Sequence, residues 1–410
     1  MEPAPRVAFF PDAYHEVDGV ANTARQFELF AIRRNLPLLT VFGGAKNGVE
    51  IEGPVTRVEC ARGRIGFALD KKHDFDLAFW RHYKRVEGAI SNFAPQVLHI
   101  TGPSDVGQLG ALIAHRLRIP LVASWHTNLH EYAEQRGRGL FWFFSDAWRN
   151  RLGRAMRKAS LRAIFRFYRI ASVLFAPNPE LMDFLEHGTG KPCFPMGRGV
   201  DTTLFNPDRR DRTSTEFVIG YVGRLTVEKN IRFLAELEHA LIDAGFRDFR
   251  LLIVGQGAEE PWLRANLQHA DYAGVLKGEA LARAYADMDV FVFPSRTDTY
   301  GNVVLEALAS GVPAVVTESG GPRFIISHGE TGFVARDLQD FVLYVRVLAT
   351  ERKLLEGMRA AARNHALDAS WDKVFEAVYA GYDRALRNCG TVGKTIQIKQ
   401  QPGVPAPRLG

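Results

Sequence analysis

The strongest chemical signal in this sequence is a polar turn that joins an apolar run to a helix-forming segment. The run Val290–Phe293 predicts a buried parallel strand, and residues 304–309 predict a helix. The turn between them carries Asp298, and Glu306 follows about one helical turn inside the helix. Helix N–H groups at such a turn favour anions, and carboxylates accept hydrogen bonds from hydroxyl groups. The pattern therefore predicts a ligand that is both anionic and rich in hydroxyls, such as a nucleotide sugar.

Cations that could hold a phosphate follow another apolar run, residues 217–222. Gly223 would let the backbone approach a pyrophosphate, while Arg224 and Lys229 would neutralise its charge. Ordinary surface ions at a solvated helix start are the alternative interpretation. The expected position of these residues opposite the Asp298 turn favours the phosphate site.

Two positions in the first half of the chain are expected at the edge of another parallel sheet. His126 follows the strand-like run 121–124, so its side chain is expected at the carboxyl edge of that sheet, near a reacting sugar carbon. A lone histidine is more often structural. Gly19 opens the helix after the first strand, where its backbone could approach a phosphate or a sugar.

Two further patterns are weaker. The run Gly255–Gly257 starts like a dinucleotide-binding loop, but Glu260 stands where the third glycine of that motif would be, so a tight turn is the better interpretation. Asp74 and Asp76 could be taken for a metal-binding pair. They lie in a charged stretch without other ligands, and we interpret them as a solvated turn.

Strand-like runs alternate with helical patterns almost throughout the chain, which predicts an α/β fold with βαβ units and parallel sheets. Two Rossmann-like, doubly wound domains are expected over residues 1–205 and 213–370, joined by the polar linker 206–212 and facing a central cleft. A final helix is expected over residues 371–387, and the Gly- and Pro-rich stretch 388–410 is expected to be disordered. The expected strands are residues 7–10, 38–42, 97–100, 121–124 and 173–176 in the first domain, and 217–223, 250–255, 290–293 and 314–316 in the second.

The composition is that of a globular protein, with 410 residues of which 46% are hydrophobic and 24% charged. Its three cysteines are widely spaced and odd in number, which favours a reducing compartment and gives neither a disulfide framework nor a metal cluster. No run reaches the roughly 18–20 apolar residues that span a bilayer, and no signal peptide is recognised. We therefore expect a cytoplasmic protein, either free or on a membrane surface.

A basic and aromatic segment, residues 136–169, carries the excess of positive charge in the first half of the chain. Its helical pattern places cations beside aromatic residues, which suits an interfacial helix on anionic lipid. Packing on the sheet and binding of single-stranded nucleic acid are the alternatives, and we favour membrane contact. The segment has one acidic residue, Asp146, and ten cations, at positions 136, 138, 149, 151, 154, 157, 158, 162, 166 and 169.

Together these motifs resemble glycosyltransferase family 4, a group of retaining enzymes with the GT-B fold. The resemblance covers nearly the whole chain except the tail, and it is strongest in residues 294–313, which are similar to the family's E-x7-E motif. Asp298 stands in place of the first glutamate of that motif, as in a subset with a T-D-T version. The resemblance continues in Gly223-Arg224 with Glu228-Lys229-Asn230, in Arg198 to Asp201 with Phe205, and in Gly320, Gly321 and Gly332.

The resemblance implies which residues take part in catalysis. Arg224 and Lys229, assisted by Arg198, would stabilise charge on the departing diphosphate. Asp298 would lie beside the donor sugar, and His126 would lie near its anomeric carbon. Closure of the two domains would assemble these groups.

The resemblance also implies the donor-binding residues. Glu306 would bind the donor ribose, and Arg198 would contact the phosphates. Backbone groups near Val275 and Leu276 would recognise the base. Further donor contacts are expected from Gly19, Tyr300, Gly301, Asn302 and Val303.

By resemblance we expect a retaining hexosyltransferase that moves a hexose from a UDP- or GDP-linked sugar to an acceptor hydroxyl, with no metal or other cofactor. The basic segment is similar to that of members that glycosylate lipids, so the expected partners are a nucleotide sugar and a lipid acceptor at the cytosolic face of an anionic membrane. A soluble or polysaccharide acceptor is the alternative within the class. Alternatives of other classes are a GT-B-fold nucleotide-sugar epimerase and a nucleic-acid binder, and we expect no nucleic-acid partner.

Overall fold

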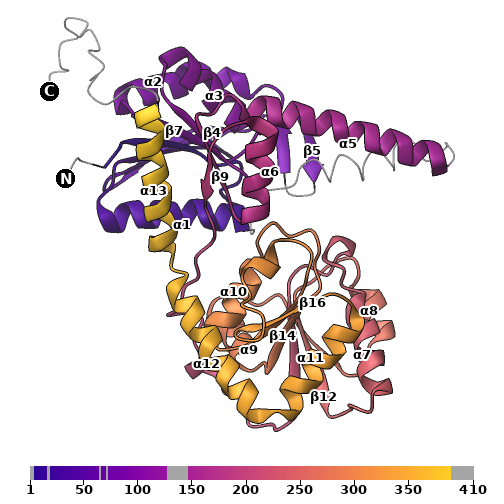
Figure 1. The fold of residues 1–410 in the computed structure, drawn as a ribbon. Helices are drawn as coiled ribbons and strands as arrows, with labels where there is room; N and C mark the ends of the chain where they lie inside the picture. The colour runs from indigo at the N-terminus through magenta and orange to yellow at the C-terminus, as the bar shows by residue number, and fades with distance from the viewer. Residues whose placement is uncertain (1–3, 16–18, 64–65, 71–72, 127–145, 389–410) are drawn as a thin grey trace, which may run out of the picture.

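The computed structural model describes residues 4–15, 19–63, 66–70, 73–126 and 146–388. In this part of the chain, two largely parallel sheets form two domains, each with helices on both faces of its sheet (Figure 1). The two doubly wound domains expected from the alternation of strands and helices are confirmed. Among the described helices, none has the length and apolar character needed to cross a bilayer.

The first sheet has eight strands in the order β10-β9-β8-β7-β1-β2-β4-β3. Neighbouring strands are parallel except β3 and β4, which pair antiparallel at one edge. The central strands are buried over their whole length because helices cover both faces. The strands are β1 (Val7–Phe10), β2 (Leu38–Gly44), β3 (Gly48–Glu52), β4 (Val55–Ala61), β7 (Val97–Ile100), β8 (Leu121–Ser124), β9 (Val173–Ala176) and β10 (Cys193–Pro195).

Two apolar clusters cover the faces of this sheet. One is closed by four helices, α2, α3, α5 and α6, which contribute residues such as Ile90 and Leu109. The other is closed by α1 and by the last helix, α13, where the ring centroids of Phe27 and Phe375 lie 4.8 Å apart. A separate hairpin, β5 (Gly66–Asp70) with β6 (His73–Asp76), lies outside the sheet. The helices are α1 (Gly19–Arg34), α2 (Tyr83–Phe93), α3 (Asp105–Leu117), α5 (Asp146–Tyr168), α6 (Pro179–Thr189) and α13 (Trp371–Asn388).

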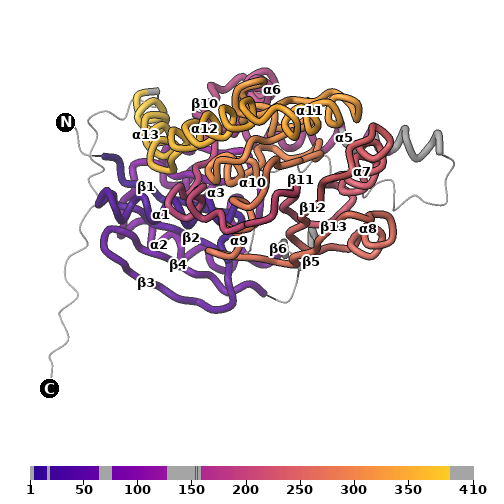
Figure 2. The backbone as a smooth tube through the Cα atoms, turned by 90° about the horizontal axis from the view of Figure 1, so that it is seen from below, coloured from indigo at the N-terminus to yellow at the C-terminus, as the bar shows by residue number. Residues whose placement is uncertain are grey.

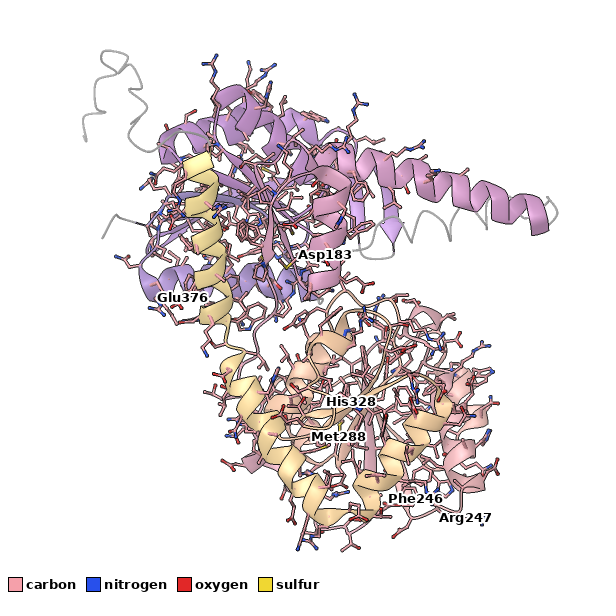
Figure 3. The ribbon with its side chains drawn as sticks, in the orientation of Figure 1. Asp183, Phe246, Arg247, Met288, His328 and Glu376 are labelled. Carbon is pink, nitrogen blue, oxygen red and sulfur yellow. The ribbon has the colours of Figure 1, made fainter. Side chains whose placement is uncertain are left out.

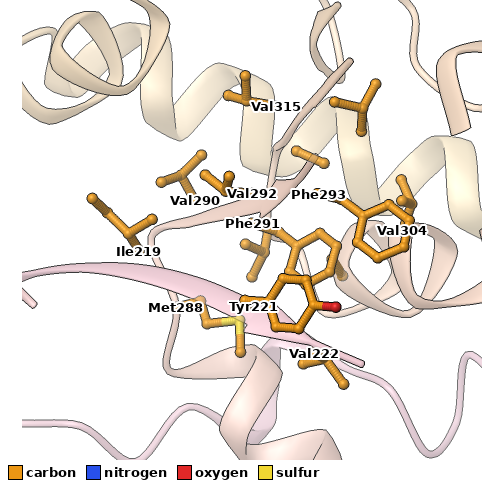
Figure 4. Close-up of a cluster of buried hydrophobic side chains, with 14 of the residues drawn as sticks. Ile219, Tyr221, Val222, Met288, Val290, Phe291, Val292, Phe293, Val304 and Val315 are labelled. Carbon is orange, nitrogen blue, oxygen red and sulfur yellow. The ribbon is translucent and has the colours of Figure 1, made fainter. Parts of the chain in front are cut away.

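The second sheet has six parallel strands in the order β13-β12-β11-β14-β15-β16. Figure 4 shows the centre of its core, where Met288 lies beside Tyr221 and the ring of Tyr221 stacks near that of Phe293. The strands are β11 (Phe217–Val222), β12 (Phe249–Val254), β13 (Ala270–Gly274), β14 (Val290–Phe293), β15 (Ala314–Thr317) and β16 (Gly332–Ala335). The helices are α7 (Phe233–Asp243), α8 (Glu260–Asn266), α9 (Gly278–Ala286), α10 (Asn302–Ala309), α11 (Leu338–Thr350) and α12 (Arg352–Asp368).

The chain crosses between the domains twice, and the two crossings touch. The N–H of Val200 on the outward crossing donates to the carbonyl of Ala369 on the return crossing (3.1 Å). Gly199 packs so closely on Trp371 that a Cβ at position 199 would lie 2.4 Å from the Trp371 backbone nitrogen. Beyond this point α12 gives way to α13, which packs back on the first domain (Figure 1).

Helix α13 is held to the first domain by charge as well as by apolar packing. Glu376 of this helix (Figure 3) pairs with Arg34 of α1 at 2.6 Å. Arg33 and Asp372 form a second pair between the same helices. Figure 2 shows α12 and α13 running along one side of the molecule, opposite the β3–β4 edge of the first sheet.

The strands expected from apolar runs are all present, whereas partly exposed or very short strands had no clear signal. β3 and β13 contain no buried residue, and β10 has three residues. An apolar run or a strict alternation marks a strand only where at least one face is buried. The edge strands β3, β10 and β13 were therefore missed. β4, which lies next to an edge, and β16, which is largely buried, were missed as well.

Asp76 does not lie in a solvated turn, and that interpretation was wrong. It ends β6 with 3% of its surface exposed, and it accepts hydrogen bonds from the backbone N–H groups of Gly63 (2.6 Å) and Ala78 (2.9 Å). It also pairs with Arg81 at 2.8 Å. Burial raises the pKa of its carboxyl, but these donors outweigh burial and hold the pKa below the ordinary value. Its main donor, Gly63, is distant in sequence, so the local pattern could not reveal the environment.

The stretch 206–212 packs against the second domain through a buried carboxylate. Asp289, 6% exposed, accepts hydrogen bonds from Arg210 (2.8 Å) and Arg212 (2.5 Å) and from the backbone N–H of Val218 (2.9 Å). These donors hold the pKa of Asp289 below its ordinary value despite burial. The carboxylate thereby ties the start of the second domain to its central strand β11.

Replacing Asp289 should destabilise the second domain. In Asp289→Asn three arginines, Arg210, Arg212 and Arg359, lose a buried counter-charge, and we expect the free energy of unfolding to fall by about 3 kcal/mol in urea denaturation. Asp271→Asn is the control, because Asp271 is 59% exposed where it pairs with Arg250. That change should cost no more than about 0.5 kcal/mol. Equal small losses in both variants would contradict the role of Asp289.

Candidate active site

Both sheets bring their candidate residues to the point where the strand order reverses. In the second sheet this point lies between the neighbouring strands β11 and β14, whose following loops carry Lys229 and Asp298. In the first sheet it lies between β1 and β7. Gly19 follows β1, and His126 follows β8, which is next to β7. Open α/β sheets bind ligands at such reversal points, at the carboxyl ends of the strands.

Lys229 and Asp298 form an ion pair across the reversal point. The Lys229 Nζ and the Asp298 Oδ1 are 2.5 Å apart, and the two side chains are only 16% and 20% exposed. The other carboxylate oxygen, Oδ2, is buried and has no hydrogen-bond partner in the part of the chain that the structure describes. The pair therefore places a cation next to an acceptor that can take a hydrogen bond from a hydroxyl group.

Glycine brings the loops after β11 and β12 close together. Gly255 has a φ of +137°, and a Cβ there would lie 1.9 Å from the carbonyl oxygen of Gly223. The carbonyl of Gln256 accepts from the N–H of Leu225 (3.0 Å), so residues 255–257 form a tight turn packed on the first loop. Arg224 extends from this loop with 43% of its side chain exposed, 3.5 Å from Glu228. Its exposure allows it to reorient toward an anion in the cleft.

Glu306 lies about one turn inside α10 and is partly exposed. Its Oε2 accepts a hydrogen bond from the hydroxyl of Tyr285 on α9 (2.9 Å). Burial raises the pKa of Glu306 to about 7, although the Tyr285 hydrogen bond acts in the opposite direction. Near neutral pH the carboxyl group is therefore present in both protonation states. A ligand whose hydroxyls donate to it would favour the carboxylate.

The turn before α10 is fixed by the loop that follows β15. Gly301 has a φ of +107°, which favours glycine, and the helix begins at Asn302. The N–H of Gly321 donates to the carbonyl of Asp298 (2.7 Å). A Cβ at Gly321 would lie 2.1 Å from the carbonyl oxygen of Thr299, so only glycine fits there. The first N–H groups of α10, at Asn302 and Val303, stand at the helix terminus, where the helix itself supplies no acceptor.

Val275 and Leu276 follow β13, the edge strand of the second sheet. Val275 is 53% exposed, and Leu276 packs partly buried on the core. No hydrogen bond of the described residues joins them to Lys229 or Asp298. Contact with the base stays a prediction.

His126 is 7% exposed, and both of its ring nitrogens are engaged. Arg198 Nη2 donates to Nδ1 (2.6 Å), and Nε2 lies 2.7 Å from the Ser124 Oγ. Burial, with the nearby Arg198 cation, holds the pKa of His126 well below its ordinary value, so the ring is neutral. The backbone carbonyl of His126 accepts from the Thr299 hydroxyl of the second domain (3.1 Å). The ring therefore faces Arg198 and Ser124, and the backbone faces the Asp298 turn.

Arg198 lies in the outward crossing and is 4% exposed. Its backbone carbonyl accepts from the hydroxyl of Tyr300 (3.3 Å), and its Nη1 donates to the carbonyl of Gly197 (3.2 Å). The guanidinium thus contacts His126 and the crossing itself, whereas the backbone of Arg198 contacts a residue before α10. The assignment of Arg198 to the donor side stays a prediction.

Hydrogen bonds and close contacts join the reversal points of the two domains. The side-chain amide of Asn178 donates to the carbonyl of Thr299 (2.7 Å). A Cβ at Gly19 would lie 3.1 Å from the side-chain amide nitrogen of Asn302. The candidate residues of the first domain, Gly19 and His126, are therefore brought to the turn that carries Asp298.

Sequence reasoning missed three side chains, one at this junction and two within the separate domains. Asn178 caps α6 by accepting from the N–H of Leu181 (2.9 Å), and an asparagine before Pro179 signals such a cap but not its contact across the cleft. Tyr285 has the pattern of an ordinary core residue. Asp12 follows β1 and accepts a hydrogen bond from Ser104, and burial raises its pKa to about 7. The position of Asp12 became informative only when the structure showed which strand ends lie at the reversal point.

Part of the basic segment forms α5, which projects from the first domain (Figure 1). Ile164 and Tyr168 are buried against that domain, whereas Lys158, Arg162 and Arg166 are exposed at four-residue spacing. We call these three residues the α5 cationic stripe. Residues 136–145 and the tail 389–410 lie outside the described residues. In the described part, no group of His, Cys, Asp and Glu side chains could hold a metal ion.

Comparison with known proteins relates both domains to one family. Residues 17–204 match the family model described as Glycosyltransferase Family 4, and residues 216–351 match the model described as Glycosyl transferases group 1. A GDP-mannose-dependent alpha-mannosyltransferase of Mycolicibacterium smegmatis is 33% identical over 311 residues, which are 74% of this chain and 77% of that protein.

A second relative is named for a lipid. The GDP-mannose-dependent alpha-(1-6)-phosphatidylinositol dimannoside mannosyltransferase of Mycobacterium tuberculosis is 31% identical over 214 residues, or 48% of this chain and 54% of that protein. Among solved structures, sucrose-phosphate synthase from Thermosynechococcus elongatus superposes with a TM-score of 0.72 at 17% identity, covering 94% of this chain and all of the other. The shared architecture is the GT-B fold. With its two facing sheets, its paired Lys229 and Asp298 and its similarity to a mannosyltransferase over most of both chains, this protein belongs to glycosyltransferase family 4.

Proposed function

We propose that this glycosyltransferase moves mannose from GDP-mannose to a hydroxyl group of a membrane lipid with retention of configuration. The observation that carries the proposal is the Lys229–Asp298 pair, set at the reversal point of the second sheet and faced by the first domain. The cation can bind the diphosphate of such a donor, and the neighbouring carboxylate can accept hydrogen bonds from the sugar hydroxyls. The GDP-mannose-dependent relative supports the choice of donor.

The diphosphate would be bound by charge and by backbone donors. Lys229 is held by Asp298, and an incoming phosphate can replace the carboxylate as its counter-ion. Arg224 is exposed enough to swing onto the same phosphate, and the N–H groups at the start of α10 supply further donors. As the bond between the sugar carbon and the phosphate oxygen breaks, these groups stabilise the charge that develops on the diphosphate.

The sugar and the ribose would use the two acids separately. Once Lys229 turns to the phosphate, both oxygens of Asp298 can accept from sugar hydroxyls, and its Oδ2 already has no partner among the described residues. Glu306 lies farther along α10 and would accept from the ribose hydroxyls. The fixed hydrogen bond from Tyr285 orients its carboxyl group for that contact.

Retention of configuration follows from the stereochemistry of the related reaction. GDP-mannose carries mannose in the α configuration, and the relative is named an alpha-mannosyltransferase. An α-linked donor that gives an α-linked product retains its configuration at the sugar carbon. We infer the same outcome for this chain.

The lipid acceptor is supported by α5. The cationic stripe of Lys158, Arg162 and Arg166 is exposed, and in the described residues no carboxylate pairs with it. Such a stripe suits an anionic membrane surface. The relative named for phosphatidylinositol dimannoside supports a lipid of this charge. Release of GDP from GDP-mannose should therefore depend on added phosphatidylinositol; release that depends only on soluble sugars, or conversion of the donor without release, would contradict the proposal.

Loss of the Lys229 charge should affect catalysis strongly. In Lys229→Met the departing diphosphate loses one preorganised cation, so we expect kcat to fall by about 10²–10³-fold while the fold is kept. Radiolabelled mannose transfer measures the effect. Lys373→Met, which removes an exposed lysine paired with Asp368, is the control and should keep full activity. A Lys229→Met enzyme with near-normal kcat would contradict the assignment.

Glu306 should show opposite effects on stability and on donor binding. Because the folded-state pKa of about 7 lies above the unfolded value of 4.5, ionised Glu306 destabilises the folded chain at higher pH. Glu306→Gln should therefore raise the unfolding midpoint at pH 8, and the gain should shrink as the pH falls from 7 toward 4.5. The same variant should lose the stabilisation that GDP gives in a thermal-shift assay. A constant difference across this pH range would contradict the raised pKa.

Removing the α5 cationic stripe should weaken membrane binding. Replacing Lys158, Arg162 and Arg166 by Gln removes about 1 kcal/mol of attraction for each charge, so we expect roughly 100-fold weaker binding to vesicles containing phosphatidylinositol. Sedimentation with vesicles at two salt concentrations measures the effect, and only the parent should be salt-sensitive. The control neutralises three exposed cations elsewhere, at Arg346, Lys353 and Arg384. Equal binding of the two variants would exclude α5 as the membrane contact.

A further inference from the structure

A buried chain of hydrogen bonds connects the last helix to the interdomain crossing. The Tyr382 hydroxyl on α13 lies 2.7 Å from His99 Nδ1, and His99 Nε2 lies 3.0 Å from the Ser124 Oγ. Ser124 continues to His126 Nε2 at 2.7 Å, and His126 Nδ1 ends the chain on Arg198 at 2.6 Å. Every member is at most 7% exposed. Five buried polar side chains thus form one continuous chain of hydrogen bonds.

The direction of this chain is fixed at its Arg198 end. A guanidinium can only donate, so His126 Nδ1 must accept, and the neutral His126 ring carries its hydrogen on Nε2. That hydrogen is donated to the Ser124 Oγ. Beyond Ser124 two arrangements are possible, in which the serine hydroxyl donates to His99 or the His99 ring donates to it. His126 has the same tautomer in both.

Burial keeps the imidazole rings of His99 and His126 uncharged. Burial lowers the pKa of His99 to about 3, and His126 is neutral for the reasons given above. An imidazolium at position 126 would have no acceptor left for Arg198 and would repel its charge. The position of the Arg198 guanidinium therefore depends on the protonation state and tautomer of His126.

We propose that Ser124 is a positioning residue, which holds His126 in its Nε2–H form so that Nδ1 keeps the Arg198 guanidinium fixed at the interdomain crossing. His99 and Tyr382 hold the Ser124 hydroxyl in place from behind. The proposal rests on the function proposed above, together with the role in stabilising the departing diphosphate that the family resemblance implies for Arg198.

The consequence of losing Ser124 can be derived from the same contacts. Without the serine oxygen, the Nε2–H of His126 has no acceptor in a dry interior, which is unfavourable. The ring can relieve this by rotating or by moving its hydrogen to Nδ1. Either change removes the acceptor for Arg198, so the guanidinium loses its fixed position.

Replacing Ser124 tests this idea in the full-length enzyme. In Ser124→Ala we expect kcat for transfer from GDP-mannose to fall by about tenfold with little change in KM for the donor, because a cation that acts on the leaving group is displaced. Ser172→Ala is the matched control, since the Ser172 hydroxyl donates to the carbonyl of Leu121 at the other end of β8 (2.9 Å). The control should keep its kcat.

A second pair of variants separates the hydroxyl from the packing. Ser124→Thr and Ser124→Val place side chains of the same shape in β8 and differ only in the hydroxyl. We expect Ser124→Thr to keep most of the activity and Ser124→Val to show the loss seen in Ser124→Ala. Equal activities in this pair would overturn the proposal.

Nitrogen-15 NMR of labelled histidine rings gives a readout that does not depend on activity. In the parent, His126 should show a protonated Nε2 and an unprotonated Nδ1, and Ser124→Val should shift its hydrogen toward Nδ1 or give a mixture. A parent His126 protonated on Nδ1, or a Ser124→Val ring identical to the parent, would overturn the proposal. Absence of transfer by the parent enzyme would instead overturn the proposed function and leave the NMR result valid.

Discussion

The site depends on the contact between the two chain crossings at Val200 and Ala369. A hydrogen bond between the crossings and the close approach of Gly199 to Trp371 hold the crossings together where the domains meet. From that point the two sheets turn the carboxyl ends of their strands toward each other, as the bond between Asn178 and Thr299 shows. Each half of the site is formed by one sheet alone, but only their meeting places His126 and Arg198 beside the turn before α10. The two crossings, which contact each other, therefore help to keep the two halves of the site together.

The charged groups among the candidate site residues have local partners or are kept close to neutral. Lys229 is balanced by Asp298, the histidine that accepts from Arg198 is uncharged, and Glu306 is held near its titration point. This matters because an unpaired charge in a partly dry cleft is strongly unfavourable. A donor that brings a diphosphate and several hydroxyls can exchange these partners one by one. Groups of the protein thus balance these charges, and a bound donor can replace those groups as partners.

The sequence predicted most strands whose burial on both faces produces a continuous apolar run, although β16, which is largely buried, was missed. Strands such as β1, β8 and β14 were placed to the residue, whereas β3 and β13 were missed because neither has a buried residue. The same limit applies to charged groups. Asp76 was taken for a solvated residue because its donor Gly63 lies in another part of the chain, and the sequence around Asp76 carries no sign of it.

The sequence by itself determined which residues are candidates for the donor chemistry, because Asp298, Glu306 and Lys229 lie in short motifs whose spacing is set by a strand, a turn and a helix. Only the tertiary structure decided how those residues are partnered. The pairing of Lys229 with Asp298, the raised pKa of Glu306 and the engagement of both His126 nitrogens all depend on burial and on groups far away in sequence. Arg198, for example, is 72 residues from His126. Local spacing fixes residue types along one turn, whereas protonation states and counter-charges arise when separate elements pack together.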